Sequence, residues 1–253
     1  MNARADPFEA WIEALEARHL ESLTFSEVRK AVQALSSLYV ERRPRIRTGA
    51  ALDGAGKRAA FALFYSPLHF LLVREIVRAL GAARIPPERI VDLGCGTGAC
   101  GAAWALEHDP EDRPPILGID RSPWAVEEAR WTYRSLGLDG TARALDLERA
   151  RLGVEGVLLA FTVNEISHDA RSRLLPRLMD RSGPGARILV VEPIARAVAP
   201  WWGEWRTAFV SAGGRADEWR FRVDLPPFLR RLDEAAGLDH RELTGRSLWL
   251  ARK

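Results

Sequence analysis

The sequence predicts an α/β protein with a doubly wound, mainly parallel sheet of seven strands, an antiparallel last strand and an N-terminal helical cap. Short apolar runs alternate with helix-like stretches, a pattern that indicates a parallel sheet covered by helices. A glycine-rich turn follows the first apolar run directly, and near the C-terminus a Thr244-Gly245 pair between two short apolar runs predicts a hairpin. The strand-like runs are 89–93, 116–119, 141–145, 157–162 and 187–191, and the helix-like stretches include 99–107, 123–136, 169–180 and 227–236.

Composition is that of a globular domain large enough to bury a core. The chain has 253 residues, of which 47% are apolar and 28% charged. Its net charge of +3 and pI of about 9.2 are mildly basic, which allows an acidic partner without requiring one. We expect a helical cap over 1–85 and the main domain over 86–253, with Pro86-Pro87 at the boundary.

The two cysteines, Cys95 and Cys100, both lie in the glycine stretch. They offer neither a disulfide framework nor metal-ligand spacing, so we expect a reducing compartment, a cytoplasmic location and no bound metal. The most apolar segment, Ala59 to Val73, is interrupted by polar residues and shorter than the ~20 residues of a membrane span. We therefore expect no membrane association.

The cap contains three predicted helices. Asp6 followed by Pro7 is a typical helix start, and Thr24 with Glu27 forms a capping box before the next apolar stripe. Ser66 with Pro67 predicts the start of a third helix.

The glycine stretch at 90–101 predicts a nucleotide-like ligand. Three glycines at alternate positions after a strand allow positive φ angles and a close approach of ligand to backbone, and the following helix offers its N-terminus. Gly96-x-Gly98-x-x-Gly101 also spells the dinucleotide fingerprint, and Asp120 lies at nearly the expected distance along the chain. The motif alone therefore leaves both a nicotinamide cofactor and S-adenosylmethionine open.

Several motifs in order resemble the class I S-adenosylmethionine-dependent methyltransferases over about 86–253. They are Val91-Asp-Leu-Gly-Cys-Gly-Thr-Gly98, the strand ending at Asp120, Ala144-Leu-Asp-Leu147 and Gly183 to Glu192. The resemblance implies that Asp120 binds the cofactor ribose, Asp146 the adenine amino group and Leu147 an adenine ring nitrogen. Asp92 would order the glycine turn or face the ammonium group, and Gly101 would serve helix packing. The full set of implied cofactor-binding residues is Asp92, Gly94, Cys95, Gly96, Gly98, Asp120, Arg121, Asp146, Leu147 and Asn164.

The candidate chemistry lies after the fourth strand-like run. Loops at the carboxyl ends of strands line the ligand crevice in a doubly wound sheet, and this loop carries Glu165 and His168. Either group could remove a proton from an oxygen or nitrogen nucleophile during methyl transfer. The alternative for His168 is a position beside a helix N-cap with no catalytic role.

Basic and aromatic residues suggest where an acceptor could bind. The basic stretch 39–58 is either a solvated face or an anion-facing strip, and the aromatic residues of 200–222 either pack into the core or form a wall for a flat acceptor. A faint similarity to small-molecule O-methyltransferases favours a small-molecule acceptor. A competing similarity to methyltransferase-like proteins of mitochondrial small-ribosomal-subunit assembly keeps an RNA-directed enzyme or a non-catalytic assembly factor open, and a nicotinamide-dependent oxidoreductase is the remaining alternative. The candidate acceptor-binding residues are Tyr39, Arg42, Arg43, Tyr65, Trp201, Trp202 and Trp205.

Overall fold

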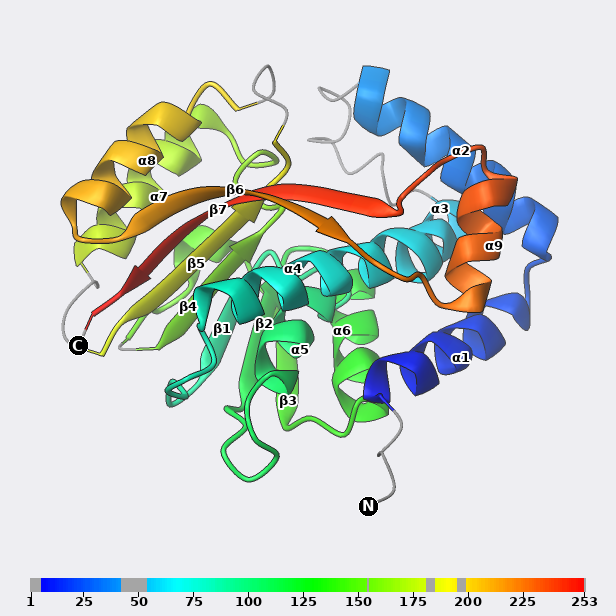
Figure 1. Cartoon of the computed structure of the whole chain (residues 1–253), viewed down its shortest axis with the longest axis horizontal. Helices are drawn as coiled ribbons and strands as arrows, with labels where there is room; N and C mark the ends of the chain where they lie inside the picture. Colours follow the sequence, from blue (N-terminus) through cyan, green and yellow to red (C-terminus); the bar gives the residue numbers. More distant parts are fainter. Residues whose placement is uncertain (1–5, 42–53, 154, 181–184, 195–198, 253) are drawn as a thin grey trace. The chain divides into compact units, whose positions relative to one another are not determined.

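The computed structural model describes residues 6–41, 54–153, 155–180, 185–194 and 199–252, with only the backbone described at 38–41. The strands form one seven-stranded sheet in the order β3-β2-β1-β4-β5-β7-β6 (Figure 1). Strands β1 to β5 are parallel, and β7 pairs antiparallel with β5. The predicted fold and its antiparallel last strand are thus confirmed. The strands are β1 Ile90–Leu93, β2 Ile116–Asp120, β3 Gly140–Ala144, β4 Gly156–Ala160, β5 Arg187–Glu192, β6 Arg215–Arg222 and β7 Glu242–Ala251.

Helices cover both faces of this sheet (Figure 1). One face carries α7 (His168–Asp180) and α8 (Trp202–Ser211), whose apolar side chains join the alternate residues of the central strands in one buried cluster. The other face carries α5 (Ala99–Leu106) and α6 (Pro123–Ser135), which pack so closely that a Cβ on Gly118 would lie 2.8 Å from the Tyr133 hydroxyl. Strands buried on both faces need continuous apolar sequence, and β1, β4 and nearly all of β5 are buried.

The N-terminal helices begin at their predicted caps. Helix α1 (Pro7–Leu20) is capped by Asp6, whose carboxylate accepts from the Phe8 N–H at 3.0 Å. Before α2 (Phe25–Glu41), Thr24 and Glu27 form the reciprocal capping box, with N···O distances of 2.8 and 3.3 Å.

Helix α4 (Ser66–Leu80) begins at Ser66, as the sequence predicts, but it continues a helical segment that starts earlier in the chain. Helix α3 (Ala55–Ala60), a π-helical turn (Phe61–Tyr65) and α4 run on as one helical segment. Proline lacks an N–H and its ring clashes with the carbonyl four residues back, so the wider π turn before Pro67 is what allows the helix to continue. The segment has 26 residues and is long and apolar enough to cross a membrane. The expectation that the apolar segment is too short for a membrane span is thereby corrected. Of its most apolar window, 72% is buried inside the protein, as in the core helix of a globular domain. The length and apolar composition of this segment are therefore only weak evidence for a membrane span.

The predicted C-terminal hairpin is wrong. Thr244 and Gly245 lie inside the single strand β7, and the other strand beside β7 is β6, a highly charged strand that the sequence did not predict. Gly245 serves close packing, since a Cβ there would lie 2.9 Å from Leu72 Cδ2. A Thr-Gly pair therefore marked a packing contact and not a turn.

The chain divides into two compact units. Unit 1 contains residues 1–69 and 222–243, and unit 2 contains 70–221 and 244–253. Unit 1 joins the N-terminal helices to α9 (Pro227–Ala235), where Gln33 Nε2 donates to the Ala236 carbonyl at 3.3 Å. Unit 2 contains β1 to β5, most of β6 and β7, and all the motifs of the predicted cofactor site.

Candidate functional site

The glycine turn after β1 has the backbone that its sequence predicts. Gly94, Gly96 and Gly98 have φ values of +75°, +52° and +79°, and Gly98 precedes the first residue of α5. A Cβ on Gly94 would lie 2.5 Å from Thr162 atoms, and one on Gly98 would lie 3.0 Å from the Ala129 Cα. Conformation and space therefore both require glycine at these two positions.

Asp92 orders the start of the helix from inside the protein. It is 1% exposed, and its Oδ2 accepts from the Gly101 N–H at 3.0 Å. Burial raises the pKa of Asp92 to about 7, with the Gly101 hydrogen bond opposing the rise and Asp120 adding to it. A Cβ on Gly101 would lie 2.9 Å from this carboxylate, so Gly101 serves helix packing in the structure.

Asp120, at the end of β2, connects the glycine turn to α6. Its Oδ2 accepts from the Gly96 N–H at 3.0 Å and its Oδ1 from the Ser122 N–H at 2.8 Å. An ionised carboxylate has about four acceptor positions, so capacity remains for the ribose hydroxyls that the resemblance implies. Asp146 and Leu147 lie after β3, where Asp146 caps a short 3-10 helix (Leu147–Arg149) through the Glu148 N–H at 2.9 Å.

The end of β4 is tied to the glycine turn by a threonine that the sequence reasoning did not single out. Thr162 Oγ1 lies 3.0 Å from the Leu93 carbonyl and 3.1 Å from the Ala160 carbonyl. Phe161 beside it has φ of +58°, the only positive value among the described residues other than glycine. Strained backbone of this kind clusters at functional sites, and here it lies at the carboxyl edge of the sheet.

A buried network joins β4, β5 and α8. Glu192, 0% exposed, accepts from the Asn164 N–H at 3.1 Å and from Asn164 Nδ2 at 2.6 Å. Asn164 Oδ1 in turn accepts from Trp201 Nε1 at 2.9 Å. Burial raises the pKa of Glu192 to about 8, the backbone hydrogen bond from Asn164 opposes this, and Glu165 adds like charge. Both ends of the Asn164 amide are thus engaged with protein groups.

The two candidate bases differ in their surroundings. Glu165 is open to solvent on one side, yet desolvation by the surrounding protein raises its pKa to about 7, with Asp120 adding like charge and Arg121 opposing it. The His168 side chain is 84% exposed at the first turn of α7, with Nδ1 3.6 Å from Asp169 Oδ1. The electrostatic coupling of Glu165 to Asp120 and Arg121 therefore favours Glu165 over the exposed His168 as the group near the glycine turn.

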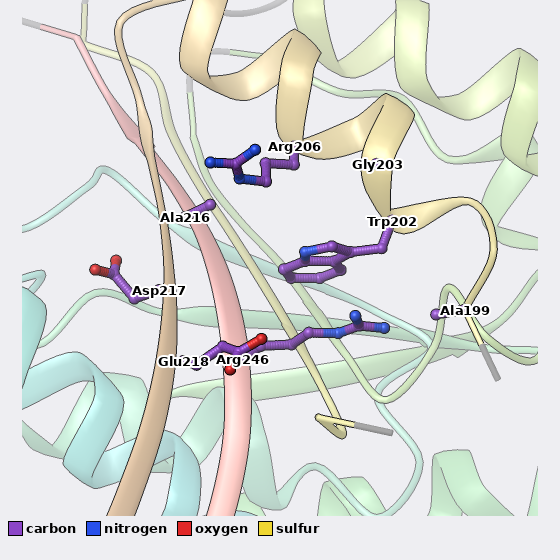
Figure 2. A pocket seen from close by; sticks show the side chains of 8 residues that line it. All are labelled: Ala199, Trp202, Gly203, Arg206, Ala216, Asp217, Glu218 and Arg246. Atoms are coloured by element: carbon purple, nitrogen blue, oxygen red, sulfur yellow. The ribbon is translucent and has the colours of Figure 1, made fainter. Parts of the chain in front are cut away.

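The tryptophans form a cluster that is mostly core. Trp205 is 1% and Trp201 7% exposed, and their ring centroids lie 5.2 Å apart, so the predicted aromatic wall is wrong for these two residues. Trp202 is only partly buried and borders an open cavity of about 370 Å³ (Figure 2). Beneath its ring lies the guanidinium of Arg246, 4.0 Å from the ring centroid.

The remaining predicted acceptor residues lie elsewhere. Tyr65 belongs to the π turn in unit 1, where burial raises its pKa to about 12 and Ser36 hydrogen-bonds it. Tyr39 is in α2, but its side chain lies outside the described residues, as do Arg42 and Arg43 entirely. The predicted Cys95 is buried, and burial raises the pKa of its thiol well above the ordinary value.

Comparisons with known proteins bear on this site. The chain is 32% identical over 117 residues to ribosomal RNA small subunit methyltransferase C of Pseudomonas aeruginosa, covering 42% of this chain and 32% of that protein. It is 31% identical over 135 residues to an O-methyltransferase of Aspergillus nomiae, covering 51% of this chain and 56% of that protein. No protein-family model matches.

The fold of the chain is also similar to that of a solved structure. A solved structure from Nostoc punctiforme, assigned as an O-methyltransferase, superposes with a TM-score of 0.55 at 16% identity, covering 87% of this chain and 72% of that one. The chain is therefore similar in sequence to S-adenosylmethionine-dependent methyltransferases and has the fold of one such solved structure. The chain spans about a third of the length of the first of these curated relatives and just over half of the second.

Three residues at this edge of the sheet escaped the sequence reasoning: Thr162, Glu192 and Arg246. Glu192 carried a usable signal, since a carboxylate closing an apolar strand lies at the ligand edge of a parallel sheet. Arg246 was obscured because it follows the Thr-Gly pair that predicted a turn.

Proposed function

We propose that this protein transfers the methyl group of S-adenosylmethionine to an oxygen or nitrogen nucleophile of a small molecule. The glycine turn, Asp120 and the Asp146 loop would hold the donor, and Glu165 would accept the proton of the nucleophile. Methyl transfer is an in-line displacement at the sulfonium carbon, so most of the rate comes from aligning the two reactants. Glu165 meets the requirement for a base near neutral pH because its pKa is raised to about 7.

The observation that supports this donor is the sign of charge around the glycine turn. Four carboxyl groups are coupled there: Asp120 raises the pKa of both Asp92 and Glu165, and Glu165 raises that of Glu192. S-adenosylmethionine carries a sulfonium and an ammonium group against one carboxylate, so a carboxylate-rich site stabilises it. The pyrophosphate of a nicotinamide cofactor would meet like charge in the same place. Electrostatics therefore favours the methyl donor over the dinucleotide.

Calorimetric titration of the protein with S-adenosylmethionine, S-adenosylhomocysteine and NAD tests this proposal. The expected result is binding of the first two and not of NAD. Asp120→Asn should weaken adenosyl-cofactor binding by about ten- to hundredfold, since a hydrogen bond to a charged group contributes ~1.5–3 kcal/mol. Asp169→Asn is the matched control, because that side chain is 83% exposed on α7. Tight NAD binding without S-adenosylmethionine binding would overturn the proposal.

Ribosomal RNA is the second candidate acceptor, because the curated relatives include ribosomal RNA methyltransferases as well as O-methyltransferases. An RNA acceptor predicts that turnover on ribosomal RNA falls steeply with salt, and that neutralising Arg42, Arg43 and Arg45 flattens the salt dependence. If the acceptor is a small molecule, turnover should depend neither on the salt concentration nor on the neutralisation of these arginines.

A further inference from the structure

The cavity beside Trp202 lies on the α8 face of the sheet, close to the proposed active site. Its walls come from α8, β6 and β7, and its volume of about 370 Å³ is within the range of small-molecule sites (Figure 2). Arg246 pairs in register with Glu192 across β5 and β7. Trp202 contacts Trp201 at a centroid distance of 5.6 Å, and Trp201 hydrogen-bonds Asn164. The cavity is thus one side chain away from the carboxyl ends of β4 and β5.

Its chemistry combines a flat ring with two guanidinium groups. Arg246 is 2% exposed and lies under the indole of Trp202, while Arg206 projects from α8 on the same side of the sheet (Figure 2). A buried arginine fixed against a ring presents a planar donor edge whose position is set before any ligand arrives. Planar groups that carry a carboxylate match both the ring and the donor edge.

Two carboxylates, Asp217 and Glu218, also line the cavity, and they contribute differently to the net charge of its lining. Asp217 is held by Arg215 through two contacts of 2.8 and 2.6 Å, and its side chain points away from Trp202 in Figure 2. Glu218 is exposed on the edge strand β6. With Asp217 held by Arg215, the lining has the two arginines Arg206 and Arg246 beside the single glutamate Glu218, a composition that favours an anionic ligand.

We propose that this cavity binds the methyl acceptor, and that the acceptor is a flat small molecule carrying one carboxylate or similar negative charge. This rests on the proposed function. The acceptor's ring would lie along Trp202, and its anionic group would accept hydrogen bonds from the exposed Arg206, with the buried charge of Arg246 beside it. Its nucleophilic end would then lie on the side of the cavity where Trp201 separates Trp202 from Asn164.

Equilibrium binding to the full chain tests the cavity, with a panel of flat carboxylates (benzoate, 4-hydroxybenzoate, indole-3-carboxylate, 2-naphthoate) and their uncharged amides as probes. We expect at least one carboxylate to bind and its amide to bind at least tenfold more weakly. Arg206→Gln and Trp202→Leu should each weaken the carboxylate about tenfold, whereas Glu218→Gln should tighten it. Arg134→Gln, on exposed α6 surface, is the control and should change nothing.

Each titration is run with and without saturating S-adenosylhomocysteine. Failure of the proposed methyl transfer can then be distinguished from failure of the proposed acceptor site in the cavity. Carboxylate binding without S-adenosylhomocysteine binding would overturn the proposed function and leave an anion site unrelated to methyl transfer. Cofactor binding with no carboxylate bound at millimolar concentration, or with equal binding of the amides, would overturn the cavity proposal alone. Arg206→Gln and Glu218→Gln change exposed side chains, so their effects do not depend on refolding of the core.

Discussion

At the scale of single residues, the site is distinguished by carboxyl groups whose pKa values are raised. Asp92 and Glu192 are buried, so their charged forms lose hydration, and desolvation by the surrounding protein also raises the pKa of the exposed Glu165. Arginine charges oppose the rise only weakly. These carboxyl groups therefore hold protons near neutral pH, and binding of a cationic ligand would favour their release.

The raised pKa of Glu165 can be measured through its effect on cofactor binding. A free carboxyl group with a pKa near 7 is protonated below that pH, and a sulfonium ligand favours its ionised form, so binding releases a proton. The dissociation constant for S-adenosylmethionine should fall about three- to tenfold from pH 6 to pH 8. S-adenosylhomocysteine has no sulfonium charge, so its affinity should change less. Isothermal titration in two buffers of different ionisation enthalpy measures the proton release directly.

Glu165→Gln should remove most of this pH dependence while S-adenosylhomocysteine still binds. His168→Gln serves as the control, because an 84% exposed side chain should leave donor binding unchanged. Equal pH dependence in the wild type and in Glu165→Gln would assign the released proton to another group.

The raised pKa of Glu192 can be measured through the pH dependence of stability. Its folded pKa of about 8 exceeds the ordinary value of 4.5, so the folded protein holds a proton that the unfolded chain has lost between those values. The free energy of unfolding therefore decreases as pH rises across that window, by at most ~1.4 kcal/mol per pH unit for one group. Urea unfolding of the cofactor-free protein from pH 5.5 to 8.5 should show this slope.

In Glu192→Gln the slope should be smaller, although its overall stability is lower because Asn164 Nδ2 would then face an amide N–H. Glu111→Gln, in an exposed loop, should keep the wild-type slope. An unchanged slope in Glu192→Gln would show that Glu192 is ionised in the folded protein.

At the scale of elements, the glycine turn is fixed by packing as well as by conformation. Gly98 and Gly213 have similar positive φ values, +79° and +88°, but only Gly98 has neighbours where a Cβ would lie. Gly213→Ala should cost ~1–2 kcal/mol from conformation alone, and Gly98→Ala should cost ~1–3 kcal/mol more from overpacking against Tyr133 and Ala129. Chemical denaturation of the two variants gives the difference. Equal losses would mean that α6 shifts to accommodate the added methyl group.

Elements also show where the sequence was informative. Caps such as Asp6 and the Thr24–Glu27 box are local patterns, so the sequence predicts them and the structure contains both. The helical turns that precede α4 and the continuous course of β7 through Thr244-Gly245 are not revealed by the local pattern. Pro67 follows a π turn, and Gly245 packs on Leu72.

At the scale of the whole molecule, the parallel sheet and its ligand edge followed from the alternation of β and α, because parallel strands all end at that edge. The glycine turn and Asp120 could therefore be predicted together. The network of Glu192, Asn164 and Trp201 joins three elements that no spacing rule connects, so it emerged only from the structure. The same holds for the stacking of Arg246 on Trp202.

The discontinuity of unit 1 also sets an order of events as the chain is made and folds. Helices α1 and α2 belong to the same unit as α9, and Gln33 and Ala236, which are hydrogen-bonded, lie 203 residues apart. Arg231 lies 4.6 Å over the Phe25 ring, another contact that must wait for the C-terminal part of the chain. A ribosome therefore releases the first helices long before their partner exists, and closing so long a loop is entropically costly until the intervening residues have folded. In pulsed hydrogen exchange during refolding, amides of β1 and β4 should gain protection before those of α1 and α2. Simultaneous protection would mean that the N-terminal helices find an earlier partner.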